Sequence, residues 1–460
     1  MRRFAALVIG VLAALSPAMA GAQTTGQVPV AGLLPTLIAD GSILTPGSLG
    51  NQSDHFVGAF RAIPAVAALN RTLALEVGGF PLGPTGTIVV TNQDGVDNRP
   101  KFASGYSDGA ATLGRGRRSL AVSYQDTTFE SVDGLNLRAS DINLFVQNRC
   151  CTGTPSDRDV LQETVSLRLH RRVTAFALGY GVNDRFDIGI VVPFVQVVGD
   201  ARVEANVLRA VGSDPTIHEF NPIGLGNQTI PGGTLLIANG TAVPFTGVDN
   251  TGNSAKKGIG DVIVRGKLML LRGGAQHLAV GLDVLAPTGD ADNFMGIGAT
   301  QVTPALMWSL ESRRVGARAK VGYTQSFGNL SSLLVAPGID RKVPNELGYE
   351  LGLDLVATSR VTLVADAIAR RIPGVTGFTT GNTLYSPNTT GPVSSPDLVA
   401  ANTSNLQETS ARAINMVLGS AGTRVYLGGG VYADLRVLFP GAGAGLRMRP
   451  TGVFTLDYGF

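Results

Sequence analysis

The sequence has 460 residues, of which 60 are glycine, 44% are hydrophobic and only 15% are charged. Glycine is nearly twice as frequent as in a typical protein and charged residues are well below the usual quarter, which disfavours a helical soluble protein. The 37 basic residues nearly balance the 34 acidic ones, so the composition also argues against a nucleic-acid partner.

The amino terminus has the layout of a secretory signal peptide. Arg2 and Arg3 supply the positive region, residues 4–15 the apolar stretch, and residues 18–20 a small-residue cleavage site. The alternative is an uncleaved membrane anchor, which is disfavoured because the apolar run is shorter than the roughly 20 residues that a spanning helix needs. We expect residues 1–22 to be a signal peptide that is removed on export.

Residues 23–112 differ from the rest of the chain. Prolines and many Gly and Ser residues predict an irregular segment, in which residues 60–77 have the pattern of one short amphipathic helix. The sequence leaves three interpretations open. This segment could plug the interior of the domain that follows, form a loose periplasmic tail, or add a hairpin around residues 87–91.

From residue 113 onward, apolar residues recur with a period of two. The clearest case is ELGYELGLDL at residues 346–355, where five apolar side chains alternate with Glu346, Glu350, Asp354 and two glycines. A helix would spread the apolar residues over both of its sides, whereas a strand separates the two sets cleanly. We therefore predict a half-apolar strand here.

Thirteen such runs are recognisable, and most approach the roughly 9–11 residues that a tilted strand needs to cross a bilayer. They are residues 118–127, 160–170, 172–181, 185–196, 258–270, 276–287, 302–311, 313–325, 344–356, 360–371, 411–425, 430–438 and 450–460. Bacterial single-chain barrels have an even number of strands, which predicts 12 or 14. Short turns alternate with long polar connections at residues 200–257 and 372–410, as in outer-membrane barrels.

The last ten residues, TGVFTLDYGF, place four apolar side chains on one face and end at Phe460. This ending resembles the sorting signature of outer-membrane barrel proteins, and it predicts recognition of the C-terminal strand by the barrel-assembly machinery. Together with the leader, it predicts an all-β protein of the bacterial outer membrane, in which residues 113–460 form a transmembrane antiparallel β-barrel of 12–14 strands. A soluble β-sandwich or β-solenoid is the alternative, disfavoured because its strands are usually shorter.

Charged residues occupy the face opposite the apolar one and are expected to line the lumen. The candidates are Arg168, Arg185, Asp187, Asp261, Arg265, Lys267, Asp283, Arg318, Lys320, Glu346, Glu350, Asp354, Asp366, Asp434 and Arg436. Their signs are mixed, whereas a porin that selects one ion sign would carry an excess of one charge. The residues could form a salt-bridged lattice that stiffens the wall, or a polar path along which a ligand moves.

The sequence offers little sign of catalytic or metal chemistry. Cys150 and Cys151 are adjacent, and in an oxidising compartment we expect a loop disulfide without a catalytic role. No nucleophile motif is present and the histidines are widely spaced, so we expect no enzyme activity, metal or cofactor, although a Ser-His-Asp hydrolase stays open because triads assemble in space. The histidines are His55, His170, His218 and His277.

Five segments resemble the outer-membrane proteins grouped under the MetA-pathway of phenol degradation. They are residues 60–83, 113–138, 178–196, 258–290 and 437–460, and they include the phrases GDVIVRGK and APTGD. The resemblance implies an outer-membrane barrel for small apolar or aromatic molecules and supplies no binding residues. We therefore expect passive uptake of small hydrophobic or aromatic compounds, with membrane lipid and such a ligand as partners. The alternative is a general, weakly selective porin or a structural barrel whose outer loops bind partners.

Overall fold

The computed structural model describes the barrel, much of the N-terminal segment and parts of the long loops. The described residues are 28–41, 55–56, 64–84, 106–139, 142–148, 159–209, 214, 218–220, 230–231, 234–236, 242–243, 248–334, 341–375, 377–382, 404–409, 412–441, 443 and 445–460. The expected signal peptide and the predicted disulfide between Cys150 and Cys151 lie outside these residues, as does the hairpin considered at residues 87–91.

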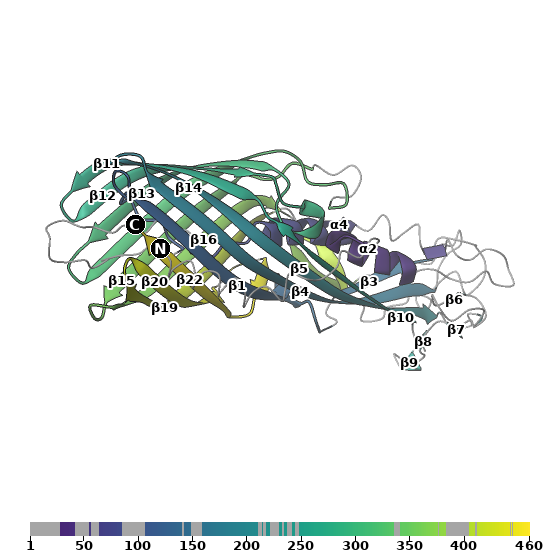
Figure 1. Cartoon of the computed structure of the whole chain (residues 1–460). Coiled ribbons are helices and arrows are strands. Elements are labelled where there is room, and N and C mark those ends of the chain that lie inside the picture. Colours follow the sequence, from purple (N-terminus) through teal and green to yellow (C-terminus); the bar gives the residue numbers. More distant parts are fainter. Residues whose placement is uncertain are drawn as a thin grey trace.

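The described strands form a closed antiparallel barrel of twelve strands (Figure 1). The barrel strands are β1 (Arg118–Val132), β4 (Val160–Gly181), β5 (Phe186–Arg209), β10 (Val248–Ile259) with β11 (Val262–Gly273), β12 (Gln276–Ala286), β13 (Thr300–Glu311), β14 (Val315–Phe327), β15 (Glu346–Val356), β16 (Val361–Val375), β19 (Arg412–Gly428), β20 (Val431–Pro440) and β22 (Thr451–Gly459). β10 and β11 are successive parts of one strand, since both pair with β5. The barrel closes where β22 pairs with β1.

The expected range of 12–14 strands is confirmed, and the odd count of thirteen runs has a simple origin. Residues 160–170 and 172–181 are one continuous 22-residue strand, β4. The Arg171-Arg172 pair resembled a break between two strands because adjacent charges interrupt the apolar alternation. In the structure these two side chains lie on opposite faces of the same strand, with Arg171 buried and Arg172 on the outside.

The outer face of the barrel is apolar, as the period of two predicts. On β15, Leu351 and Leu353 are 57% and 59% exposed, whereas Gly352 and Asp354 between and beside them are buried. A closed barrel satisfies all of its backbone hydrogen bonds, and a band of exposed leucine, valine and aromatic side chains suits the hydrocarbon of a bilayer. The protein is therefore a transmembrane barrel of the bacterial outer membrane. Among the described helices, none is long and apolar enough to cross a membrane.

Part of the wall continues far beyond the rest of the barrel (Figure 1). β4 and β5 are 22 and 24 residues long, and their outer ends pair with β3 (Ile142–Gln147) and β10. The expectation of a loop over residues 200–257 is therefore wrong at both ends, where 200–209 and 248–257 are strand. In residues 201–207 buried Ala and Val alternate with solvent-facing polar side chains, and this polar face made the segment look like a loop.

The expected loop at residues 372–410 also needs correction. β16 continues to Val375, and a separate hairpin follows, formed by β17 (Phe378–Asn382) and β18 (Ser404–Glu408). The remaining short elements lie in the connections between the long strands. They are β2 (Leu135–Asn136), β6 (Glu219–Phe220), β7 (Ile230–Pro231), β8 (Thr234–Leu236), β9 (Ala242–Val243), the 3₁₀-helix η4 (Ala291–Asn293) and β21 (Leu446–Met448).

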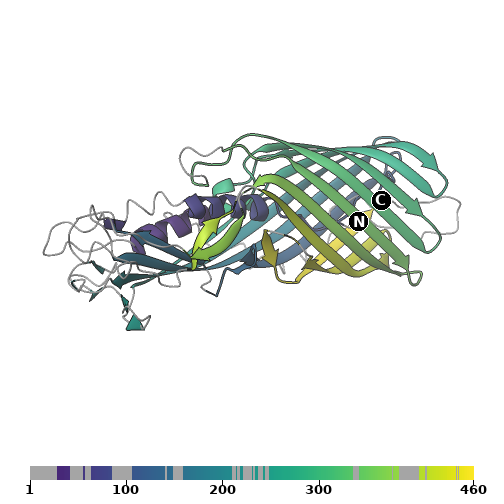
Figure 2. The same cartoon turned by 180° about the vertical axis from the view of Figure 1, so that it is seen from behind.

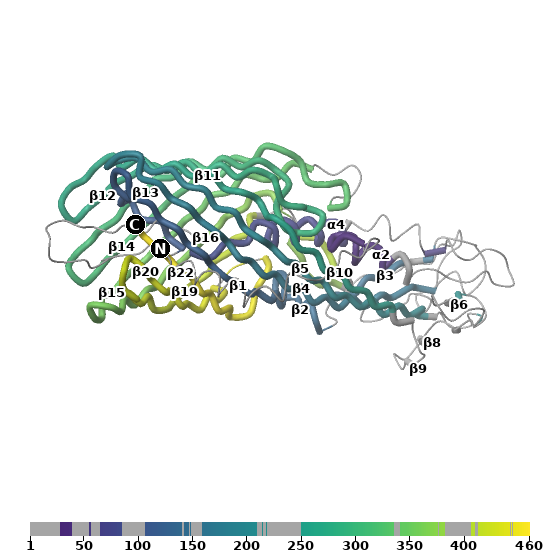
Figure 3. Tube along the Cα trace, viewed as in Figure 1, coloured from purple at the N-terminus to yellow at the C-terminus, as the bar shows by residue number. Residues whose placement is uncertain are grey.

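The N-terminal segment packs against the protruding strands and then enters the barrel (Figures 2 and 3). Helix α2 (Val30–Gly41) buries its apolar side chains against β5 and β10. Helix α4 (Pro64–Leu73) continues into the π-helix η2 (Ala74–Gly78), which agrees with the helix expected at residues 60–77. The segment therefore fits a plug, and a loose tail is not what the described residues form.

Candidate functional site

Residues 106–113 cross the inside of the barrel, and we call them the lumenal strap. The backbone N–H of Ala110 donates to Ser309 Oγ (2.6 Å), and the N–H of Leu113 donates to Asp187 Oδ2 (2.8 Å). Lys267 Nζ donates to the carbonyl oxygen of Gly109 (3.3 Å). The strap is thus bound by inward-facing side chains of β5, β11 and β13.

The strap comes close to the wall at Gly109. A Cβ atom on Gly109 would lie 3.2 Å from Ser309 Oγ and 3.3 Å from Arg318 Cδ, closer than most such contacts in proteins. The preceding residue, Asp108, lies 3.7 Å from Arg265. Burial alone would raise the pKa of Asp108, but the cations around it, led by Arg265, hold that pKa below its usual value. Asp108 is therefore an ionised anchor of the strap.

A cavity of about 230 Å³ remains beside the strap inside the barrel. Part of its lining is apolar, namely Phe80, Pro81, Leu82, Pro193, Ile263, Leu285, Met295, Ile297 and Ile368. The lining also contains charged residues, namely Asp108, Arg171, Asp261, Arg265, Asp283, Lys320, Glu346, Glu350 and Arg370. A concave space lined by apolar side chains together with convergent polar groups is the usual form of a small-molecule site.

The charged residues of the cavity lining form a chain of ion pairs. Lys320 Nζ lies 3.3 Å from Glu350 and 3.9 Å from Asp283, which in turn lies 3.6 Å from Arg265. Nearby, Arg370 pairs with Glu346 (2.6 Å) and also donates to the carbonyl oxygen of Gly79. The ion pairs therefore join the strap and the preceding N-terminal residues to five wall strands, β11, β12, β14, β15 and β16.

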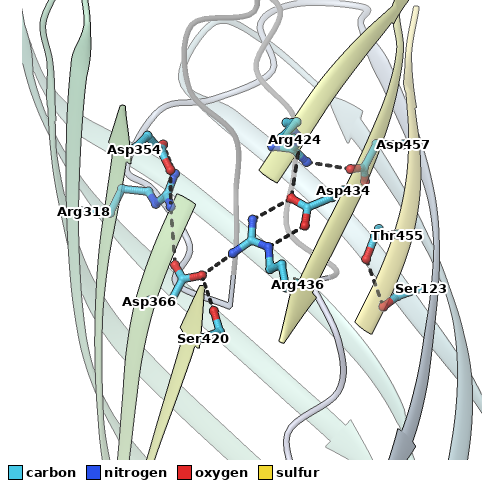
Figure 4. Close-up of polar contacts among 10 residues, drawn as sticks. All are labelled: Ser123, Arg318, Asp354, Asp366, Ser420, Arg424, Asp434, Arg436, Thr455 and Asp457. Carbon is cyan, nitrogen blue, oxygen red and sulfur yellow. Dashed lines mark hydrogen bonds and ion pairs between the residues drawn. The ribbon is translucent and has the colours of Figure 1, made fainter. Parts of the chain in front are cut away.

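A second ion-pair network lies across β14, β15, β16, β19, β20 and β22 (Figure 4). Its centre is Asp366, which accepts hydrogen bonds from Arg318 (3.4 Å), Arg436 and Ser420 (3.0 Å). Arg318 is also bound by Asp354, and Arg436 by Asp434 (2.5 and 2.6 Å). The network ends with Arg424 and Asp457 (2.6 Å) on the last strands.

The structure places most of the predicted lumen residues on the inner side of the wall, where they are buried or half-buried. These are Asp187, Asp261, Arg265, Lys267, Asp283, Arg318, Lys320, Glu346, Glu350, Asp354, Asp366, Asp434 and Arg436. Two others are corrections. Arg168 is exposed on the outer face of the protruding part of β4, because its neighbours Leu167 and Leu169 take the inner positions. Arg185 is exposed in the short turn that precedes β5.

Several lumenal residues were missed by the sequence pattern. Arg171 was lost in the apparent break within β4. Asp108 lies in the segment that was predicted to be irregular. Asp457 alternates with the apolar residues of the last strand, so the period of two that located the other candidates would have found it too.

The histidines form contacts that their spacing did not predict. His55 Nδ1 lies 3.0 Å from His218 Nε2, and His218 Nδ1 lies 2.8 Å from a carboxylate oxygen of Asp159. These side chains are buried, and none of them lines the cavity. Among the described residues, no group of three or more His, Cys, Asp or Glu side chains is arranged to hold a metal ion.

Glu76 is a buried carboxyl group at the junction between η2 and the barrel. Its Oε2 accepts the backbone N–H of Leu446 (2.7 Å). Burial, together with the charge of Asp133, raises its pKa to about 8, although the Leu446 bond and Arg370 act in the opposite direction. Glu76 therefore carries a proton at neutral pH.

Stability should fall as pH rises because of Glu76. The folded-state pKa of about 8 exceeds the usual value of 4.5, so between these values the folded state binds more protons than the unfolded state. We expect stability to decrease from about pH 5 to pH 8 in wild type, and this slope to be smaller in Glu76→Gln. The measurement is urea unfolding in detergent micelles at several pH values. Equal slopes in both proteins would contradict the assignment.

Comparison with known proteins agrees with the resemblance seen in the sequence. Residues 184–332 match the family described as "Putative MetA-pathway of phenol degradation". This span covers β5 to β14 and includes much of the cavity wall. Among curated proteins, none matches this chain.

Comparison with solved structures returns outer-membrane channels at low sequence identity. An outer membrane channel from Pseudomonas putida F1 is 12% identical, with 76% of this chain and 98% of that chain covered and a TM-score of 0.41. The toluene transporter TbuX from Ralstonia pickettii is 10% identical, with 76% of this chain and 92% of that chain covered and a TM-score of 0.32. A Pseudomonas aeruginosa FadL homologue is 13% identical, with 77% of this chain and 92% of that chain covered and a TM-score of 0.30.

Proposed function

We propose that this protein is an outer-membrane channel for the passive uptake of small hydrophobic or aromatic compounds. The observation that carries the proposal is the half-apolar cavity inside the barrel, bounded by the lumenal strap and by Phe80, Ile263 and Ile297. An open aqueous porin would leave a continuous polar channel, whereas here the strap and ion pairs occupy the lumen. The description of the matched family names phenol degradation, which is compatible with uptake of an aromatic compound.

The mechanism requires binding and diffusion without catalysis. A ligand would leave bulk water, pack its ring against the apolar wall of the cavity, and pass on when the strap shifts. The ion pairs of Arg265, Lys320 and Arg370 hold the cavity in shape while their charges compensate one another. We also propose that the barrel-assembly machinery recognises the C-terminal strand ending at Phe460, whose side chain is exposed.

The test is growth of a bacterium on a monoaromatic carbon source at limiting concentration, with and without this protein. We expect deletion to slow growth at low concentration but not at high concentration, where the compound crosses the membrane unaided. Re-expression of the wild-type chain should restore growth. Equal growth of the two strains at every concentration, with the protein present in the outer membrane of the first, would overturn the proposal.

A further inference from the structure

Arg171 is a buried cation beside the lumenal cavity, and two of its donor atoms have no hydrogen-bond partner among the described residues. It lies on β4 between Thr127 of β1 and Val197 of β5, is 2% exposed, and lines the cavity. Among the described residues, none accepts a hydrogen bond from its Nε or Nη1. Buried polar groups normally find partners, so an arginine left without them at the edge of a cavity points to a ligand group.

The nearest opposite charge does not use these donors. Asp261 interacts electrostatically with Arg171. However, its two carboxylate oxygens accept the backbone N–H groups of Gly289 (2.9 Å) and Ile297 (2.8 Å). Asp261 therefore balances the charge of the guanidinium. The Nε and Nη1 donors of Arg171 still need an oxygen atom that accepts their hydrogen bonds.

The remaining charges of the cavity decide what kind of oxygen fits. The lining contains four cations and five carboxylates, namely Arg171, Arg265, Lys320 and Arg370 against Asp108, Asp261, Asp283, Glu346 and Glu350. A carboxylate ligand would add a further negative charge to a lining in which carboxylates already outnumber the cations, and the like charges would repel it. An uncharged carbonyl or hydroxyl oxygen would satisfy Arg171 without that repulsion.

We infer that the cavity binds a small uncharged aromatic compound bearing an oxygen acceptor, and that Arg171 donates a hydrogen bond to this oxygen. The inference rests on the proposed function and narrows its substrate class. An apolar cavity of about 150 Å³ holds a benzene ring, so the 230 Å³ here has room for one ring with a short oxygenated substituent. Apolar lining residues such as Phe80, Ile263 and Ile297 offer the ring its contacts.

The test compares three ligands of similar size on the full-length mature protein in lipid nanodiscs. Equilibrium dialysis of radiolabelled acetophenone, cumene and benzoate, corrected for empty nanodiscs, measures binding of an oxygen acceptor, a hydrocarbon and an anion. We expect acetophenone to bind most tightly. Arg171→Met should weaken acetophenone binding roughly tenfold or more, as expected for a lost charged hydrogen bond, and leave cumene binding unchanged.

The matched control is Arg172→Met, the next residue on β4, which pairs with Asp126 on the outer face and should leave all three affinities unchanged. Heat-modifiable mobility on a gel reports whether each variant is folded. If Arg171→Met does not fold, the wild-type comparison decides, since equal affinities for acetophenone and cumene would overturn the inference. Tighter binding of benzoate would also overturn it. Absence of binding by both neutral compounds would instead count against the proposed function.

Discussion

Removal of residues 28–112 is expected to turn a nearly silent barrel into one with large, steady ion conductance. In the wild-type protein, the lumenal strap is bound by Ser309, Asp187 and Lys267, and Asp108 lies among cations of the wall. Without the strap, water and ions should fill the lumen. The wall should stay closed, because its strands still pair with their neighbours. Single-channel recording in planar bilayers, with the full-length and truncated proteins side by side, measures the change.

A milder variant separates displacement of the strap from loss of the whole segment. Gly109→Val should introduce side-chain atoms against Ser309 and Arg318 and thereby push the strap from the wall, so we expect intermittent openings. Gly452→Val on β22 is a suitable control, because no atom lies within 4 Å of a Cβ there and its φ is not positive. Large openings already present in the full-length protein would mean that it is a general porin and that uptake of hydrophobic compounds is not its function.

The sequence predicted the barrel because its physical requirement repeats at every strand. Lipid outside and a polar lumen inside force a period of two. The structure shows this period on β15, where Leu351 and Leu353 face outward and Asp354 is buried. The prediction failed where lipid was absent. In residues 201–207 the outward positions face water, so polar side chains there resembled a loop although the buried Ala and Val continue the strand.

The candidate site was only half predictable for a related reason. The period of two assigns a residue to the inner face, and it selected Asp366 and Arg436, which are both buried in the structure. It does not reveal which N-terminal residues return to that face, so Asp108, Phe80 and the strap were out of reach. Arg171 was missed because the adjacent Arg172 on the outer face interrupts the period-two pattern of apolar residues in β4.

The largest loss of stability from a single substitution is expected at Asp366. Asp366→Ala would remove the carboxylate shared by Arg318 and Arg436, which are both buried, and would leave Ser420 without its acceptor. Arg318 and Arg436 would keep Asp354 and Asp434 as partners, but each would lose a hydrogen bond to a carboxylate. Such bonds contribute about 1.5–3 kcal/mol each, so the two together amount to about 3–5 kcal/mol. We expect a loss of this size in the free energy of unfolding, measured by urea titration of the refolded protein in liposomes.

An exposed ion pair of the same protein provides the control. Glu130 and Arg449 are in contact on the surface, so Glu130→Ala should cost no more than about 1 kcal/mol, because water screens both charges. If Asp366→Ala costs equally little, the lumen around the network must be as wet as the outside, and the ion pairs could not stiffen the wall. A large difference between the two variants would instead mean that the mixed charges serve the structure there, which leaves the cavity lined by Arg171 as the part of the lumen available to a ligand.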